Sequence, residues 1–134
     1  MVEESDFELR ISATIEGIQF SPRKLLSTSK LTFEEYYEKG DEFQRKTHTD
    51  VYQSGCATLC VSVKSLSERN SQFDSLLNII VDNYEAIKES GATDIYIWVA
   101  VFKSIQGNWG ATAEQIQKIA SFNGSLAVTY YAEN

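Results

Sequence analysis

His48 is the only histidine among 134 residues, and it lies in a polar stretch that also contains Asp50. A histidine beside an aspartate is the pairing that activates a nucleophile in many hydrolases. The chain lacks the Gly-x-Ser-x-Gly turn that would supply such a nucleophile. Because most acid–base chemistry near neutral pH uses histidine, we interpret His48 as an exposed loop residue and expect neither catalytic residues nor enzyme activity.

Cys56 and Cys60 are four residues apart, so in an extended strand they share a face but are too distant for an unstrained disulfide. Two thiols and one histidine are too few for a structural zinc site. We interpret both cysteines as small core residues, with a redox or metal role as the alternative. No metal and no cofactor are expected.

Carboxylates outnumber Lys and Arg by 19 to 12, which gives a formal net charge of −7. Phosphate contacts need a basic stripe, which the sequence lacks, so we expect no nucleic acid partner. The densest acidic cluster is interleaved with aromatic rings. Its simplest interpretation is a solvated face, and the second is a patch that binds a cationic protein surface. The predicted patch consists of Glu34, Glu35, Tyr36, Tyr37, Glu38, Asp41 and Glu42.

Trp109 lies in the loop 106–110, which matches neither a dinucleotide-binding nor a P-loop fingerprint. We interpret this loop as a turn whose Trp109 covers an edge of the core. The alternative is an exposed anchor for a partner, and Trp109 is therefore added to the predicted binding residues.

The chain has the length of one domain, so residues 1–134 are expected to form a single domain. No apolar run approaches the ~20 residues of a membrane span. The opening residues are acidic, whereas a signal peptide begins with basic residues. We therefore expect a cytoplasmic protein with no membrane partner.

Periodicity predicts the first elements that position these residues. Apolar residues alternate with polar ones over 7–15, which predicts a strand with one buried face. Ser21 and Pro22 have the types of an N-cap and a first helical residue, so a short helix is expected through residue 26. A second strand is predicted at 56–63, in a hairpin with residues 48–52. Residues 30–52 are otherwise unassigned, with a turn at 39–41.

The second half of the chain has stronger patterns. An apolar stripe predicts a long helix over 71–88, ended by Gly91. Residues 93–102 are apolar on both faces, as in a central strand that is covered on each side. A shorter helix is predicted over 112–121, followed by a turn and a last strand over 126–131. The inward residues of that shorter helix are expected to be Ala113, Ile116, Ile119 and Ala120.

This order of elements predicts an α+β fold, in which a single layer of mostly antiparallel sheet packs against two main helices. Several segments together resemble a small bacterial family of unknown function. They are the strand 7–15, the helix start Phe20-Ser21-Pro22-Arg23, the turn 39–41, the long helix, and the close from Ala113-Glu114-Gln115-Ile116 to Tyr130-Tyr131.

Several members of that family lie beside polymorphic toxins and are taken to be immunity proteins, including those of contact-dependent growth inhibition systems. The resemblance covers nearly the whole chain and implies a stand-alone α+β domain that binds and neutralises a cognate toxin domain. Many such toxins are nucleases with basic clefts, which an acidic partner suits. The resemblance implies no catalytic residue.

Two other functions remain open from the sequence. One is a small-molecule or peptide-binding module with a pocket lined by Tyr96, Trp98 and Trp109. The other is a homodimer with a structural role. The sequence leaves the oligomeric state undetermined.

Overall fold

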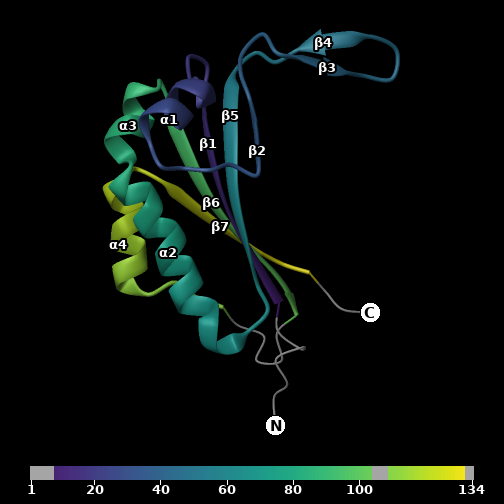
Figure 1. The fold of residues 1–134 in the computed structure, drawn as a ribbon. Helices are drawn as coiled ribbons and strands as arrows, with labels where there is room; N and C mark the ends of the chain where they lie inside the picture. The colour runs from purple at the N-terminus through teal and green to yellow at the C-terminus, as the bar shows by residue number, and fades with distance from the viewer. Residues whose placement is uncertain (1–7, 104–108, 132–134) are drawn as a thin grey trace.

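The computed structural model describes residues 8–103 and 109–131 of the chain. In this part the chain forms a five-stranded mixed sheet, a separate two-stranded sheet and four α-helices (Figure 1). The strand order of the larger sheet is β2-β5-β1-β6-β7. The α+β prediction is confirmed.

The sheet is built around β1 (Glu8–Gly17), which pairs antiparallel with both β5 (Gly55–Val63) and β6 (Asp94–Lys103). Ala13 lies opposite Leu59 on one side and opposite Ile97 on the other. The predicted alternation of the first strand is confirmed, although Phe7 lies outside the described residues. Its fully buried side chains are Leu9, Ile11, Ala13 and Ile15.

The two edges of this sheet are β2 (Glu35–Tyr37) and β7 (Ser125–Tyr130). β2 pairs antiparallel with β5, whereas β7 pairs parallel with β6. The chain therefore crosses from β6 to β7 through α4 (Ala113–Ser121), as a parallel connection requires.

The predicted hairpin between residues 48–52 and 56–63 is wrong. β3 (Glu42–Gln44) and β4 (Thr49–Val51) pair with each other instead, and their hairpin projects away from the main sheet (Figure 1). Tyr52 closes this hairpin by donating its N–H to Asp41 O at 2.9 Å, and its ring stacks on Tyr37 at 3.6 Å. These contacts keep the segment before β5 with β3, which leaves β5 to pair with β1 and β2.

The helices α1 (Pro22–Thr28), α2 (Arg69–Asp82) and α3 (Tyr84–Glu89) lie with α4 on one face of the sheet (Figure 1). A 3₁₀ turn (Leu66–Glu68) leads from β5 into α2. The predicted start of α1 is confirmed, because the Ser21 side chain accepts the N–H of Lys24 and Pro22 is the first helical residue. None of the described helices is long and apolar enough to cross a membrane.

The predicted long helix is two helices, because the chain leaves helical geometry at Asn83 (φ −111°, ψ 11°). The Asn83 side chain donates to Ile79 O at 2.8 Å, and the backbone N–H of Asn83 donates to the same oxygen at 3.2 Å. The expected end of the second helix is confirmed. Gly91 has φ +97°, and Ala92 donates its N–H to Ile87 O, as in a Schellman motif.

The predicted inward face of α4 is wrong for Ala113, Ile116 and Ala120, which are exposed, and correct for Ile119. Gln115 is buried instead. Its side chain accepts the N–H of Thr112 at 2.8 Å and donates to Asp74 Oδ1 at 3.0 Å. Because the buried amide has these partners, its burial carries no penalty for an unsatisfied hydrogen-bonding group. A polar residue can therefore take an inward position.

Candidate partner-binding surface

The face of the sheet opposite the helices is uncovered by any element of the described chain (Figure 1). We call it the open face. The strand registers place alternate residues of each strand on it. They include Arg10, Ser12, Thr14, Glu16, Glu35, Tyr37, Cys56, Thr58, Cys60, Asp94, Tyr96, Trp98 and Thr129.

Two neighbouring aromatic residues of β6 stand on the open face. Tyr96 is 44% exposed and Trp98 is 41% exposed, so the prediction that this strand is covered on both sides is wrong. The indole N–H of Trp98 donates to Thr129 Oγ1 on β7 at 2.9 Å. This hydrogen bond holds the indole ring in one orientation and satisfies its single N–H donor.

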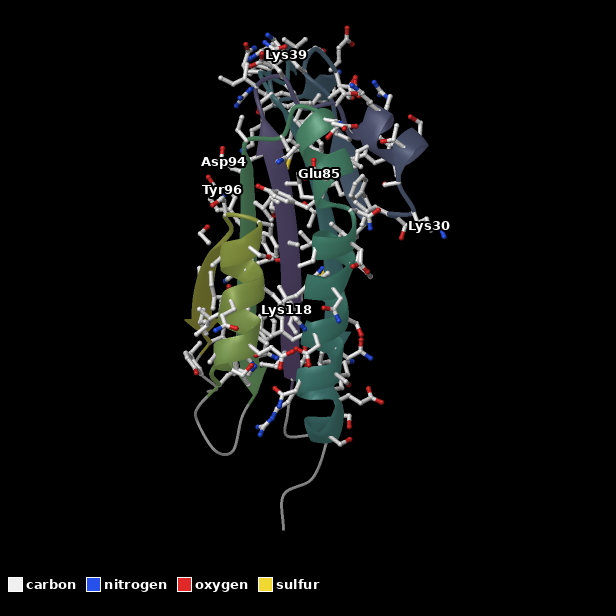
Figure 2. All side chains as sticks on the ribbon, turned by 90° about the vertical axis from the view of Figure 1, so that its left-hand side faces the viewer. Lys30, Lys39, Glu85, Asp94, Tyr96 and Lys118 are labelled. Carbon is white, nitrogen blue, oxygen red and sulfur yellow. The ribbon has the colours of Figure 1, made fainter. Side chains whose placement is uncertain are left out.

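Carboxylates surround one end of this aromatic pair. Glu16 of β1 lies opposite Asp94 of β6, and the negative charge of Asp94 raises the pKa of Tyr96 above its usual value, helped by burial and by Glu16. Figure 2 shows Asp94 and Tyr96 at the margin of the molecule, clear of the helices. Glu35 of β2 lies in the same row across the sheet as Tyr96, with β5 and β1 between them. An acidic, aromatic surface is therefore present at this end of the open face.

Three carboxylates of the predicted patch have partners within the chain. Glu34 Oε1 lies 3.3 Å from Arg10 Nη2. Glu38 and Asp41 lie 3.4 Å and 3.1 Å from Arg23, and Glu38 also accepts hydrogen bonds from the Ser21 hydroxyl and the Arg23 N–H. The ion pairs of Glu38 and Asp41 with Arg23 hold the turn before β3 against α1.

Asp41 is the carboxylate of the predicted patch whose pKa is perturbed. The N–H of Glu38 donates to its carboxylate at 2.9 Å, and this bond, together with Arg23, lowers the pKa of Asp41 below its usual value. Glu35 and Glu42, by contrast, have no ion pair within the described chain and are exposed. They are the carboxylates of the predicted patch that are available to a partner.

The two tyrosines of the predicted patch point to opposite sides of β2. Tyr36 is exposed and packs edge to face with Phe33 at 6.2 Å. Tyr37 is half-buried on the open-face side, and burial, followed by a hydrogen bond to Cys56, raises its pKa to about 12. The structure therefore divides the predicted patch, with Glu34, Glu35 and Tyr37 at the open face and Glu42 on the β3–β4 hairpin.

Trp109 lies on the helical side of the sheet, where its ring meets Phe73 of α2 at 5.3 Å. Its backbone N–H donates to the Tyr130 hydroxyl at 2.7 Å. Trp109 therefore covers an edge of the core and does not meet Tyr96 and Trp98, so the predicted pocket lined by these three residues does not form. Residues 106–108 of the same predicted loop lie outside the described chain.

The interpretation of the cysteines as core residues is wrong, because Cys56 and Cys60 are half-buried on the open face. Cys60 accepts a hydrogen bond from Arg10 Nε at 3.0 Å. Burial is the main cause that raises the pKa of the Cys56 thiol, with added repulsion from Glu16 and Glu35. Within the described residues, no group of three or more His, Cys, Asp or Glu side chains is placed to hold a metal ion.

His48 is exposed in the turn between β3 and β4, which confirms its interpretation as a loop residue. Its Nε2 lies 3.9 Å from Asp50 Oδ2, but the same oxygen accepts a hydrogen bond from Arg45 Nε at 3.0 Å. The N–H of Val51 and, after it, Arg45 bind the Asp50 carboxylate and lower its pKa. The other ring nitrogen of the exposed imidazole, Nδ1, lies 3.1 Å from the Thr47 hydroxyl.

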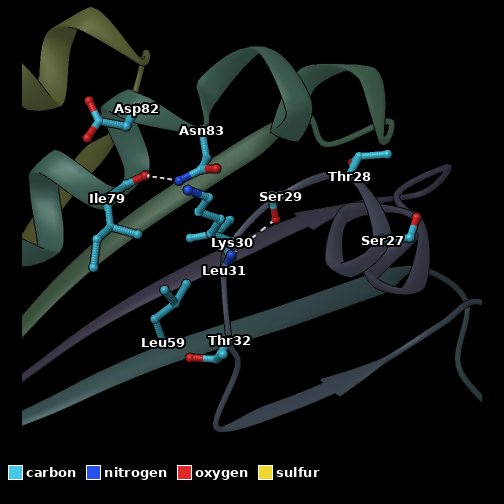
Figure 3. A pocket seen from close by; sticks show the side chains of 10 residues that line it. All are labelled: Ser27, Thr28, Ser29, Lys30, Leu31, Thr32, Leu59, Ile79, Asp82 and Asn83. Carbon is cyan, nitrogen blue, oxygen red and sulfur yellow. Dashed lines mark hydrogen bonds between the residues drawn. The ribbon is translucent and has the colours of Figure 1, made fainter.

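A hollow of about 740 Å³ separates the end of α1 from the end of α2 (Figure 3). Leu31 and Leu59 form its buried apolar floor. Lys30 and Asp82 also line the hollow, and the described chain provides neither with an ion pair. No pattern along the chain indicates this hollow, because three segments far apart in the sequence line it.

No family model, curated protein or solved structure matches this chain. The chemistry of the open face and of the hollow is therefore the basis for assigning a function.

Proposed function

We propose that this protein is an immunity protein, which binds and neutralises a cognate nuclease toxin domain in the cytoplasm through an acidic surface. The observation that carries the proposal is the open face, where exposed Tyr96 and Trp98 share one surface with Glu16, Glu35 and Asp94. The resemblance to a family with immunity proteins among its members agrees with this function.

The open face has the composition of a protein-binding surface. Aromatic side chains with few rotatable bonds are enriched among residues that dominate binding energy. Strands hold Tyr96 and Trp98 in place, and the hydrogen bond to Thr129 orients the indole, so little conformational entropy is lost on binding. Carboxylates around the rings attract a basic surface and accelerate its association.

The predicted patch contributes to this surface in two ways. Glu35 and Glu42 meet the basic partner directly, because no ion pair within the described chain occupies them. Glu34, Glu38 and Asp41 hold β2 and its flanking turns through Arg10 and Arg23. A toxin whose basic cleft is covered in this way loses the surface on which phosphate would bind.

The test is affinity capture of the tagged protein co-expressed with the products of its neighbouring genes, followed by mass spectrometry. A stoichiometric basic domain that becomes toxic when this protein is withdrawn is the expected result. Recovery of the protein without such a domain would overturn the proposal.

Matched charge reversals locate the surface. Glu35→Lys should weaken capture by at least tenfold, because it places a positive charge on the open face beside a basic partner. Glu89→Lys makes the same change on exposed α3, on the opposite side of the sheet, and should bind like the wild type. Both variants should keep the wild-type circular dichroism spectrum. Equal affinities for the two variants would exclude the open face.

A second candidate function is recognition of a small zwitterionic ligand in the hollow of Figure 3. Its volume of about 740 Å³ is that of a ligand pocket, and Lys30 and Asp82 offer opposite charges above an apolar floor. A panel of free amino acids should then raise the melting temperature of the protein, and Asp82→Asn should remove the effect. The absence of any shift would exclude this function.

A further inference from the structure

The two edges of the main sheet are unequal. The β2 edge is three residues long and begins at Glu35, directly after Glu34. The β7 edge is six residues long, and its sequence Ser-Leu-Ala-Val-Thr-Tyr contains no charge and no proline. Natural edge strands are usually shortened, charged or bulged, because an unprotected edge pairs with other chains. β7 has none of these protections, since its register with β6 is continuous.

The free hydrogen-bonding groups of β7 can be assigned by residue. Tyr131 donates its N–H inward to Val101 O at 2.9 Å. Successive residues of a strand direct their backbone groups to opposite edges, so Leu126, Val128 and Tyr130 direct theirs away from β6. β6 is the only strand of the described chain that pairs with β7. Backbone groups without a strand partner in the described residues therefore repeat at every second position along this edge.

Apolar side chains flank the same edge. Val128 is 38% exposed and Tyr130 is 48% exposed. On α4, Gln115 is directed toward α2 by its hydrogen bond to Asp74. Ile116, about 100° further around the helix, therefore lies toward the flank away from α2, and it is 53% exposed. Figure 2 shows β7 on that side of α4. An apolar strip thus runs beside the unpaired edge.

We propose that β7 pairs antiparallel with β7 of a second copy of this chain, so that one continuous sheet runs through a two-fold symmetric dimer. Two identical edges meet across a two-fold axis only in the antiparallel sense, and the contact is then self-complementary. Ile116 and Val128 of each protomer pack beside the new strand pair.

Charge favours a second copy over a basic partner at this edge. Two chains with a formal charge of −7 repel each other wherever their carboxylates meet. The residues of β7 carry no charge, so pairing here avoids that repulsion, while a basic partner gains no electrostatic attraction. The two-fold axis stands perpendicular to the sheet, which leaves both open faces uncovered on the same side. The dimer is thus independent of the proposed toxin binding.

The first test is sedimentation equilibrium of the full chain over a dilution series. A mass of twice 15.1 kDa that falls toward the monomer on dilution is expected. A wild-type protein that stays monomeric at every concentration would overturn the proposal. A protein that associates only with an added toxin domain, and not with itself, would overturn it as well.

Charge insertion then locates the dimer contact. Val128→Lys should weaken the dimer at least tenfold, and Val81→Lys is the matched control, because both valines are 38% exposed and Val81 lies on α2. Ile116→Lys repeats the test on a helix surface in case the strand variant unfolds. A dimer that tolerates both Ile116→Lys and a folded Val128→Lys would place the contact elsewhere and overturn the proposal.

Discussion

Arg23 Nη2 lies 3.1 Å from Asp41 Oδ2, which ties the first turn of α1 to the turn that precedes β3. The same guanidinium lies 3.4 Å from Glu38. Two carboxylates that belong to the densest acidic cluster of the sequence therefore share one cation within the chain. The number of acidic residues in a sequence segment therefore overstates the charge available to a partner when some of them form ion pairs within the chain.

Asp41→Asn should destabilise the protein in a pH-dependent way. The pKa of Asp41 is lowered from its ordinary value of 3.8 in the folded chain, first by the N–H of Glu38 and then by Arg23. Its contribution to stability is therefore present above the unfolded-state pKa and is lost as the pH falls through the folded-state pKa. Urea unfolding should show a lower midpoint for Asp41→Asn at pH 7, and the difference should close in acid.

Glu42→Gln is the control for that series, because Glu42 is exposed and has no ion pair within the described chain. Its urea midpoint should match that of the wild type. A difference between Asp41→Asn and the wild type that is the same at every pH would contradict the electrostatic explanation.

Gln115→Ala should lower the free energy of unfolding by about 1–3 kcal/mol. The change removes the N-terminal cap contact to Thr112 and leaves Asp74 without its amide partner. Gln117→Ala on the exposed side of the same helix should stay within about 0.5 kcal/mol of the wild type. Chemical denaturation of both variants measures the difference, and equal stabilities would show that the buried amide contributes nothing.

Gly91→Ala and Gly40→Ala separate backbone strain from steric clash. Both glycines have positive φ, +97° and +92°, so alanine costs about 1–2 kcal/mol at either position. A Cβ at Gly91 would also collide with the carbonyl oxygen of Gln19, whereas Gly40 has open space around it. Thermal unfolding should therefore give a clearly larger loss for Gly91→Ala. A loss at Gly91 no larger than that at Gly40 would mean that the loop around Gln19 moves aside.

Cys56 should react slowly with iodoacetamide at pH 8. Burial raises the pKa of its thiol, so the reactive thiolate fraction is small, and half of the side chain is shielded. Peptide mapping by mass spectrometry should show at least a tenfold faster labelling of the same residue in urea. Equal labelling rates in the folded and unfolded protein would contradict this environment.

Local signals in the sequence were sufficient for many elements. Ser21 and Pro22 predicted the start of α1, and the alternation of Leu9, Ile11 and Ala13 predicted the buried face of β1. Gly91 predicted a helix end, which its positive φ confirms. These features depend on residues adjacent in the chain, where capping, steric freedom and periodicity act directly.

Errors arose where the hydrogen bonds of one polar side chain outweighed an apolar pattern. The apolar stripe continued through residue 83, but the Asn83 side chain binds Ile79 O and the helix breaks. Composition placed Ile116 inward on α4, yet Asp74 of another helix supplies the partner that buries Gln115 instead. In both cases one polar side chain changed the outcome, because a satisfied amide competes with apolar burial.

The sequence by itself determined the α+β class, the acidic charge, and most helices and strands, because these follow from composition and short-range periodicity. The tertiary structure alone decided which surface is free. It placed all described helices on one face of the sheet, exposed Tyr96 and Trp98 on the other, and moved Trp109 to the core edge. It also left β7 as an uncharged edge. Whether a side chain is exposed depends on which distant segments pack against it. Those contacts form only when the strands pair in the folded chain.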